Sequence, residues 1–443
     1  MNILSIVFGL LFLSVLMILH ELGHFLAGKA LGFKIISFNI FMGPILWQHR
    51  GKDGVLYALR LFPIGASVEF AGEDSGINED PENPGSVVKE VDPDDPGLFY
   101  NRPRGKRAIV IFMGPAINFI TAIIAFAILF SSFGVVLPVV GELEQDSIAA
   151  ESGLTVGDKI ISYNGDRIYS AIDFSMTDNF DRRDENHFVV QSENGEKKDI
   201  YLSTPMVERY QLGVYLNQDQ NGKFIISEVQ DNPASGETVF ESGDEILNVN
   251  GRPFKDISSL ILQEGDEPNK LNVSLKRDGK TIEKTFQAKV VSSRQPLGFY
   301  LSEAEGLGQK LGQSFVYPLS IIKSTFKGFS LLFSGAISPE EGLTGPVGIV
   351  NMVGGVVNSE QSSSAKFEQL LKLFGLISVA IGFTNLLPIP PFDGFQLLVI
   401  GVESLRGKDL SLKLKERMAM VGFVIIIALT ILVFYLDISK LFG

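Results

Sequence analysis

Residues 3–27 read ILSIVFGLLFLSVLMILHELGHFLA, an apolar run with no charged side chain before His20. A helix needs about 20 apolar residues to cross the hydrocarbon core of a bilayer. The run is long enough, no basic residue precedes it, and it contains no small-residue cleavage site. It therefore predicts a retained transmembrane helix rather than a cleaved signal peptide.

This helix ends in HELGH (20–24), which matches the pattern H-E-x-x-H. On a helix, positions i and i+4 share a face, so His20 and His24 can bind one zinc ion while Glu21 acts as a general base. Two histidines that only hydrogen-bond to their neighbours are the alternative. Ionisable residues inside a span are costly and usually functional, which favours a catalytic zinc site.

A catalytic zinc ion needs a third protein ligand and one open position. The chain has no cysteine, and its remaining histidines, His49 and His187, lie in a basic turn and a polar run. Asp393 is the better candidate, because it follows an uncharged run in NLLPIPPFDGFQ (385–396), where prolines interrupt the helix. The alternative is an interfacial aspartate that only caps the next helix.

Three more uncharged runs are long enough to span a bilayer. One begins at Ala108, and the others cover 373–392 and 418–436. Basic residues cluster at 102–107 and at 401–417. Because basic loops stay in the cytoplasm, both termini and residues of about 138 to 310 are expected on the opposite side. His20, His24 and Asp393 then all lie towards the cytoplasmic ends of their spans.

The chain is acidic, with 38 basic and 51 acidic side chains and a net charge of −13. This charge argues against a nucleic-acid partner, which would need a basic face on the protein. Much of the acidity lies in residues 69–97, where ten acids face the single base Lys89. The segment predicts a solvated acidic loop.

The soluble middle of the chain contains an internal repeat. Residues 141–168 align without gaps to residues 227–254 at an offset of 86, and LGVYL (212–216) resembles LGFYL (297–301). Repetition at this length predicts two copies of one small domain. Alternating apolar residues closed by Asn-Gly, as in IISYNG and ILNVNG, predict strands that end in tight turns.

Residues 33–70, between the first two spans, are rich in β-branched and aromatic side chains and are too apolar for an ordinary cytoplasmic loop. Backbone that is neither helix nor closed barrel lies at membrane depth only where protein buries it or where it lines a cavity. We therefore expect a β-hairpin sheet that dips into the membrane face of the protein.

The motifs taken together resemble the bacterial site-2 intramembrane zinc metalloproteases of the regulator-of-sigma-E-protease type, over essentially the whole chain. The resemblance rests on HELGH (20–24), MGPAINF (113–119), two PDZ-like repeats, TGPVGI (344–349) and NLLPIPPFDG (385–394). It implies zinc ligands at His20, His24 and Asp393, a general base at Glu21, and a substrate-positioning role for Asn385. The family commonly has leucine where this chain has Phe392, and Phe395-Gln396 also departs from the family pattern.

The expected fold is a polytopic α-helical membrane protein with four transmembrane helices, a membrane-dipping β-hairpin sheet and two tandem PDZ-like α/β domains. The expected segments are helix 1–32, β-hairpin 33–72, acidic loop 73–107, helix 108–137, PDZ-like domains 138–208 and 209–303, an amphipathic helix with its connection 304–367, helix 368–400, basic loop 401–417 and helix 418–443.

The resemblance implies regulated intramembrane proteolysis in the bacterial inner membrane, with the active site towards the cytoplasm and the PDZ-like domains outside it. Its substrates would be single-span membrane proteins, such as anti-sigma factors after a first cleavage, and remnant signal peptides. The PDZ-like pair either captures peptide C-termini or filters substrates by size. A non-catalytic membrane scaffold or chaperone is the main alternative, and a lipid hydrolase is a weaker one, because no feature recognises a head group.

Overall fold

The computed structural model describes residues 3–72, 79–80, 83–87, 95–144, 147–218, 223–229, 240–255, 257–268 and 270–442. Residues 73–78, 81–82 and 88–94 of the expected acidic loop 73–107 lie outside the described residues, and the loop ends earlier than expected, because residues 104–107 already belong to a helix. The chain divides into two compact units, a membrane unit of residues 1–135 and 303–443 and a second unit of residues 136–302.

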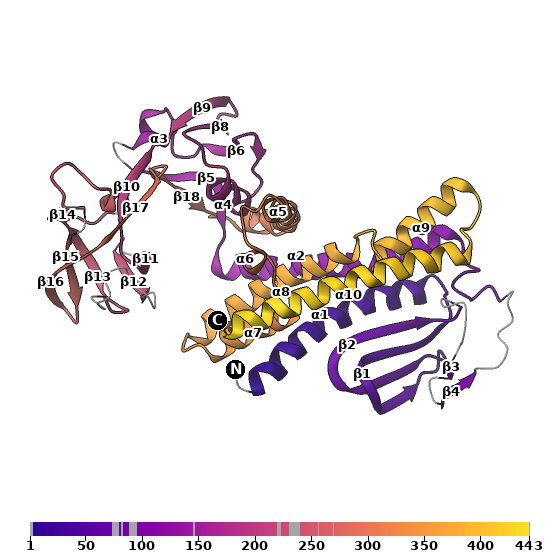
Figure 1. Ribbon diagram of the computed structural model, residues 1–443. Coiled ribbons are helices and arrows are strands. Elements are labelled where there is room, and N and C mark those ends of the chain that lie inside the picture. The colour runs from indigo at the N-terminus through magenta and orange to yellow at the C-terminus, as the bar shows by residue number, and fades with distance from the viewer. Residues whose placement is uncertain are drawn as a thin grey trace. The chain divides into compact units, whose positions relative to one another are not determined.

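The membrane unit is mostly helical (Figure 1). Its helices are α1 (Ile3–Ala30), α2 (Arg104–Phe133), α5 (Leu307–Phe333), α6 (Pro339–Gly342), α7 (Pro346–Asn358), α8 (Ser363–Asn385), α9 (Asp393–Arg406) and α10 (Leu412–Phe442). Its strands are β1 (Ile35–Arg50), β2 (Leu56–Phe70), β3 (Glu79–Asp80) and β4 (Asn83–Val87).

Four of these helices are long and apolar enough to cross a membrane: α1, α2, α8 and α10. They match the four spans expected from the sequence. The third is interrupted as predicted, because α8 ends at Asn385 and α9 begins at Asp393, with Pro388, Pro390 and Pro391 in the turns between them. Helix α7, a short apolar helix that the sequence analysis did not foresee, packs against α1 through Gly9.

Small residues bring α1, α2 and α8 close together, as is typical of helix packing in membranes. A Cβ atom at Gly23 would lie 2.2 Å from the carbonyl oxygen of Met113 on α2. A Cβ atom at Gly375 on α8 would lie 2.7 Å from the ring of Phe126, which is fully buried. The expected amphipathic helix is α5, whose Tyr317 packs on the Phe126 ring with centroids 4.9 Å apart.

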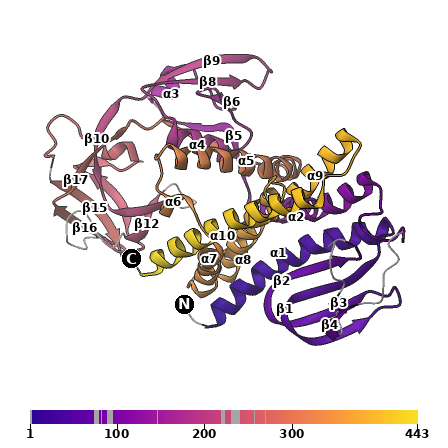
Figure 2. The same ribbon diagram turned by 45° about the vertical axis from the view of Figure 1, so that its right-hand side comes forward.

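Strands β1 and β2 form the predicted antiparallel hairpin, and each bends so that four segments lie side by side (Figure 2). The pairing register gives the order 66–70, 35–40, 56–60, 45–50. Among the described residues no strand pairs with the free side of 66–70, so this segment is an edge. The sheet lies along α1, where the Ser14 hydroxyl donates to the carbonyl of Pro63 at 2.7 Å.

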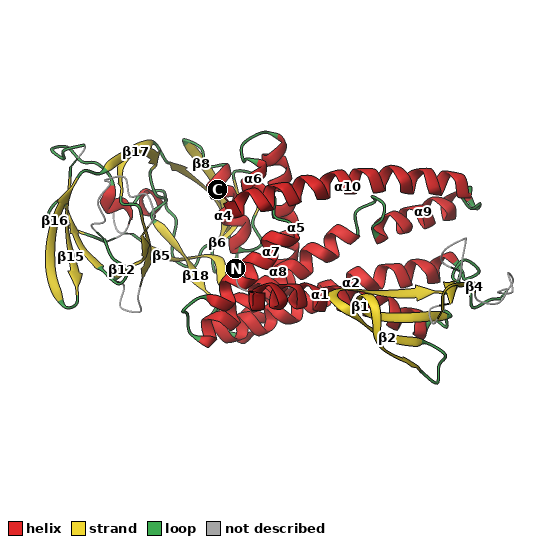
Figure 3. Ribbon diagram, turned by 60° about the horizontal axis from the view of Figure 1, so that its bottom comes forward, coloured by secondary structure: helices red, strands yellow, loops and turns green. Residues whose placement is uncertain are grey.

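The second unit contains two six-stranded sheets of similar build and a separate two-stranded sheet (Figure 3). Its elements are β5 (Val136–Leu143), α3 (Ile148–Glu151), β6 (Lys159–Tyr163), β7 (Asp166–Arg167), α4 (Ala171–Phe180), β8 (Glu185–Gln191), β9 (Lys197–Ser203), β10 (Met206–Gln211), β11 (Val214–Gln218), β12 (Phe224–Val229), β13 (Glu245–Val249), β14 (Arg252–Pro253), the 3₁₀ turn Ile257–Leu260, β15 (Leu271–Arg277), β16 (Lys280–Phe286), β17 (Lys289–Arg294) and β18 (Phe299–Glu303).

The orders of the two large sheets are β18-β5-β6-β8-β9 and β11-β12-β13-β15-β16, with β7 and β14 pairing at β6 and β13. Strands β6, β7 and β8 therefore stand in the same order as β13, β14 and β15, which lie 86 residues later in the chain. Strands β10 and β17 pair with each other in a separate antiparallel sheet. One strand departs from the expected boundaries. β18 follows the second repeat in sequence but completes the first sheet, so the second repeat is inserted into the first.

Local chemistry also repeats between the two sheets. Asn164 and Asn250 have φ of 51° and 49° and each precedes a glycine at positive φ, as the Asn-Gly turns predict. The buried Asp158 carboxylate accepts the backbone N–H of Thr155 at 2.9 Å. The equivalent carboxylate of Asp244 accepts the N–H of Glu241 at the same distance.

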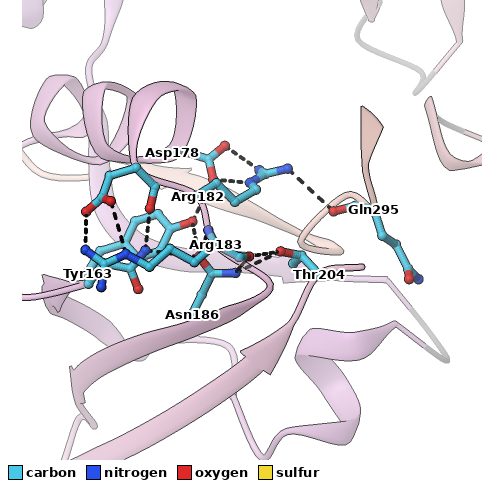
Figure 4. Close-up of polar contacts among 9 residues, drawn as sticks. Tyr163, Asp178, Arg182, Arg183, Asn186, Thr204 and Gln295 are labelled. Atoms are coloured by element: carbon cyan, nitrogen blue, oxygen red, sulfur yellow. Dashed lines mark hydrogen bonds and ion pairs between the residues drawn. The ribbon is translucent and has the colours of Figure 1, made fainter. Parts of the chain in front are cut away.

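A buried polar network fixes the first sheet to the loop before β18 (Figure 4). The fully buried Asn186 donates to the Thr204 hydroxyl at 2.8 Å and accepts from the Arg183 N–H at 2.9 Å. Arg182 pairs with Asp178 on α4 and also donates to the Gln295 carbonyl. Buried polar groups need such partners, so the network holds α4 and this loop in one arrangement.

Candidate metal centre

The three candidate ligands lie within one small cluster of the membrane unit. His20 and His24 are one turn apart on α1, and Asp393 is the first residue of α9. The Nε2 atoms of His20 and His24 lie 3.0 and 3.4 Å from the same Asp393 carboxylate oxygen, Oδ2, and 3.1 Å from each other. Among the described residues, this is the one group of three such side chains close enough to hold a metal ion.

His24 is oriented by the backbone of α2. Its Nδ1 lies 2.9 Å from the carbonyl oxygen of Val110, and the side chain is buried. A carbonyl can only accept, so Nδ1 carries the proton and donates it. The Nε2 lone pair is then free towards the cluster, which is the usual arrangement of a metal-ligating histidine.

His20 is oriented by a side chain of α2. Its Nδ1 lies 3.2 Å from the amide nitrogen of Asn118, while the amide oxygen of this buried asparagine has no hydrogen-bond partner. The two ends of an asparagine amide are interchangeable when the hydrogen-bond network is assigned. With the amide turned over, its oxygen accepts a hydrogen bond from the Nδ1–H of His20. The Nε2 atom of His20 then also presents a lone pair to the cluster.

A zinc ion fits this donor set. Two imidazole nitrogens and one carboxylate oxygen leave a position open for chemistry. The Asp393 oxygen that faces both histidines is buried and has no hydrogen-bond partner, a costly state that a cation would relieve. Gly114 of α2 keeps space for the ring of His24, because a Cβ atom there would lie 2.2 Å from its Nε2.

Glu21 lies beside the cluster and contacts the edge of the hairpin sheet. Its carboxylate accepts the backbone N–H of Val68 at 3.0 Å. Val68 belongs to the edge segment 66–70, so the candidate base lies at the free edge of the hairpin sheet. The sequence predicted Glu21 from its motif, but it could not show this contact.

None of the other sequence candidates belongs to the group of three ligands. Asn385 is the half-buried last residue of α8, and its substrate-positioning role stays a prediction. His49 lies in β1 with its ring stacked on Trp47. His187 lies in the second unit and pairs with Asp199 at 2.7 Å. These contacts agree with the choice of Asp393 over either histidine.

Two functional contacts were missed by the sequence analysis, those of Val110 and Asn118. Asn118 stands in MGPAINF (113–119), four residues after Gly114, so both face α1 from one side of α2. An asparagine within an apolar span is itself a signal, because a polar side chain there needs a partner.

Replacing Asn118 by leucine is expected to weaken zinc binding about 10- to 100-fold, the usual cost of removing a residue that orients a metal ligand. Zinc retention in a chelator series measures this effect. Asn118→Asp keeps an acceptor and should retain most of the affinity. Ser378→Ala is the matched control, because it removes hydrogen bonds to the Asn118 backbone carbonyl and to the Thr121 hydroxyl but leaves the Asn118 side chain in place. Equal zinc retention by Asn118→Leu and the native protein would contradict the assigned contact.

Comparisons with known proteins agree with this geometry. The sequence model described as peptidase family M50 matches residues 8–429. The chain is 26% identical to "Regulator of sigma-E protease RseP" of Escherichia coli (strain K12), over 97% of both chains. It is also 26% identical to a protein of Rhizobium meliloti (strain 1021) whose name is "Putative zinc metalloprotease", over 98% of this chain and 96% of that one.

Proposed function

This chain belongs to peptidase family M50, and from that premise we propose that it is a zinc protease that cuts single-span membrane proteins within or at the edge of the bilayer. One observation carries the proposal. His20 and His24 lie inside a helix that is long and apolar enough to span a membrane, and they meet Asp393 at the break between α8 and α9. A metal site in that position acts on bonds at membrane depth.

His20, His24 and Asp393 would hold the zinc ion. A zinc ion held there supplies a Lewis acid that makes hydroxide available near neutral pH and polarises a carbonyl oxygen. Glu21 accepts the proton of the attacking water and passes it to the leaving amine, the task of a general base that then acts as a general acid. The Val68 N–H keeps the Glu21 carboxylate in place beside the ligands.

The hairpin sheet is the proposed platform for substrate. Segment 66–70 is an edge, and an extended peptide can add to such an edge as one more strand. Strand addition suits this chemistry because a peptide bond must leave its helix before it can be cut. The apolar side chains exposed on the hairpin, including Met42, Trp47 and Phe62, support its insertion into the membrane face.

The two sheets of the second unit are proposed to be PDZ-like domains. A cavity of about 520 Å³ lies in this unit and is lined by Phe174 of α4, by the start of β18, and by Arg182, Arg209 and Arg294. A groove between a helix and a strand, with cations near it, suits capture of a peptide C-terminus. The alternative role of this unit is to filter substrates by size, which requires no bound peptide.

The proposed setting is the bacterial inner membrane, with the metal centre towards the cytoplasm and the second unit outside it. By the positive-inside rule, the basic cluster marks the cytoplasmic end of α2. The metal centre is proposed to lie near that end, because the Val110 carbonyl that contacts His24 is three residues from Arg107 in this cluster. The proposed substrates, as the family resemblance implies, are anti-sigma-type proteins after a first cleavage, and remnant signal peptides.

The test uses the purified full chain in lipid vesicles with a single-span substrate. We expect about one zinc ion per chain, the count of a three-ligand catalytic site, and cleavage that stops after chelation and returns with zinc. The alternative function is a membrane-anchored scaffold that binds peptides through the second unit. Peptide binding without zinc and without cleavage would favour the scaffold.

A further inference from the structure

A large cavity in the membrane unit is not accounted for by the metal centre. Its volume is about 890 Å³, within the range of pockets that bury a drug-sized ligand. It lies between the end of β2, the loop before α9, helix α9 itself and the first half of α10. None of the three metal ligands lines it.

The cavity continues the active site on two sides. One wall is residues 68–70 of β2, and the N–H of Val68 already contacts the Glu21 carboxylate. A second wall includes Pro390 and Pro391. Pro391 lies two positions before the ligand Asp393 in the sequence. Strand residues advance about 3.3 Å each, so a peptide paired along β2 and cut beside Glu21 enters the cavity within two or three residues.

The walls of the cavity are mostly apolar. Phe70 of β2, Val399 and Ile400 of α9, and Phe423 of α10 all line it. Transferring one large apolar side chain from water into such a space stabilises the complex. The cavity therefore favours an extended peptide with a bulky apolar residue near the bond that is cut.

The far end of the cavity carries a buried group of charges. Glu403 is fully buried and accepts from the Lys415 ammonium at 2.7 Å and from the Leu410 N–H at 3.0 Å. Its second oxygen lies 3.9 Å from a nitrogen of the buried Arg107 and has no hydrogen-bond partner. The Nε–H of Arg107 is also buried without a partner.

These two unsatisfied atoms match the needs of a peptide backbone. A strand that runs past the end of β2 loses its ladder partners, and each of its N–H and C=O groups then needs another. Both atoms are closed to solvent in this structure, so a shift of the two side chains on peptide binding would let the Glu403 oxygen accept one N–H and the Arg107 Nε–H donate to one C=O. An acyl chain would satisfy neither of them.

From this geometry we infer that the cavity is a substrate subsite that holds the unwound peptide on one side of the scissile bond and selects a large apolar side chain two to three residues from it. The inference rests on the proposed protease function. A membrane lipid is the competing occupant of the same space.

The absence of native cysteines allows a test on protein that is already folded. Ala419→Cys on α10 places a thiol on the cavity wall. Val421→Cys is the matched control, because Val421 is exposed on the same helix and does not line the cavity. Each variant is treated with a small methyl or a bulky benzyl methanethiosulfonate, and zinc content checks that the metal centre is intact.

Cleavage is measured on a peptide series in which alanine is replaced by leucine at each position around the scissile bond. We expect the native protein to prefer leucine at one position two or three residues from the bond. The benzyl label on the Ala419→Cys variant should lower that preference at least about 10-fold, the scale on which an apolar pocket distinguishes side chains. The methyl label on this variant, and both labels on the Val421→Cys variant, should leave the preference unchanged.

A second measurement needs no catalysis. In an otherwise inactive Glu21→Gln background, bound peptide should slow labelling of the thiol in the Ala419→Cys variant but not of the thiol in the Val421→Cys variant. Equal labelling with and without peptide, or an unchanged leucine preference after benzylation, would overturn the subsite. If the label displaces co-purified lipid and the preference for leucine near the scissile bond does not change, the cavity is a lipid site. If the unlabelled native protein cuts none of the peptides, the protease function itself fails instead.

Discussion

Glu21→Gln is expected to keep about one zinc ion per chain and to lower the rate of peptide cleavage by about 10²- to 10⁴-fold, the usual contribution of a general acid–base group. The three ligand side chains are untouched, so the metal site should remain. Glutamine also keeps an oxygen that can accept the Val68 N–H, so the contact with the hairpin edge should survive. What it loses is the ability to take a proton from water.

The measurement pairs elemental analysis with single-turnover cleavage of a single-span substrate in vesicles. Glu360→Gln is the matched control, because it removes an exposed carboxylate just before α8, while the metal centre lies near the opposite end of that helix, where Gly382 packs on Asn118. A 23-residue helix is about 35 Å long. Cleavage at the native rate by Glu21→Gln would rule out this residue as the base.

Asp393→Asn is expected to abolish cleavage and to lose most of the bound zinc. Asparagine is nearly isosteric, but its neutral amide is a poor replacement for a carboxylate ligand, and it leaves two histidines to hold the ion. The N-cap residue of α9 is Phe392, and no side chain makes a cap hydrogen bond there, so the helix does not depend on a cap from residue 393. Helix α9, which begins at residue 393, should therefore form in the variant as it does in the native protein.

This variant separates the two interpretations of Asp393 that the sequence left open. A pure helix-capping residue would tolerate the change with zinc content and activity intact. His24→Ala provides the comparison, because it removes an undisputed member of the motif and should give the same loss of zinc. Native zinc content in Asp393→Asn beside an empty His24→Ala variant would show that the third ligand lies elsewhere.

The fold of the membrane unit follows closely from local sequence. Spans depend on uninterrupted apolar runs of sufficient length, and helices α1, α2, α8 and α10 lie where such runs occur. The break before Asp393 follows from prolines, which fix the backbone and remove hydrogen-bond donors. In the second unit, the turns at Asn164 and Asn250 follow from the tolerance of Asn-Gly for positive φ. Each of these properties acts over a few neighbouring residues.

Connections between distant segments did not follow from the sequence. Strand β18 completes the first sheet across an inserted repeat, and no local preference distinguishes the two sheets that it could join. Helix α7 is too short to be recognised as a span, and its partner α1 lies more than 300 residues away. Pairing of this kind depends on which surfaces meet in three dimensions.

The sequence alone determined the donor types, because H-E-x-x-H and a lone aspartate at a helix break leave few other choices for a metal. Only the tertiary structure decided that the Val110 carbonyl and the Asn118 amide orient the two imidazoles, that Val68 holds Glu21, and that a cavity continues from this point. The physical reason is the distance along the chain over which each property is determined. Ligand chemistry belongs to single side chains, whereas orientation and cavity shape come from backbone and side-chain atoms that packing brings together from distant parts of the chain.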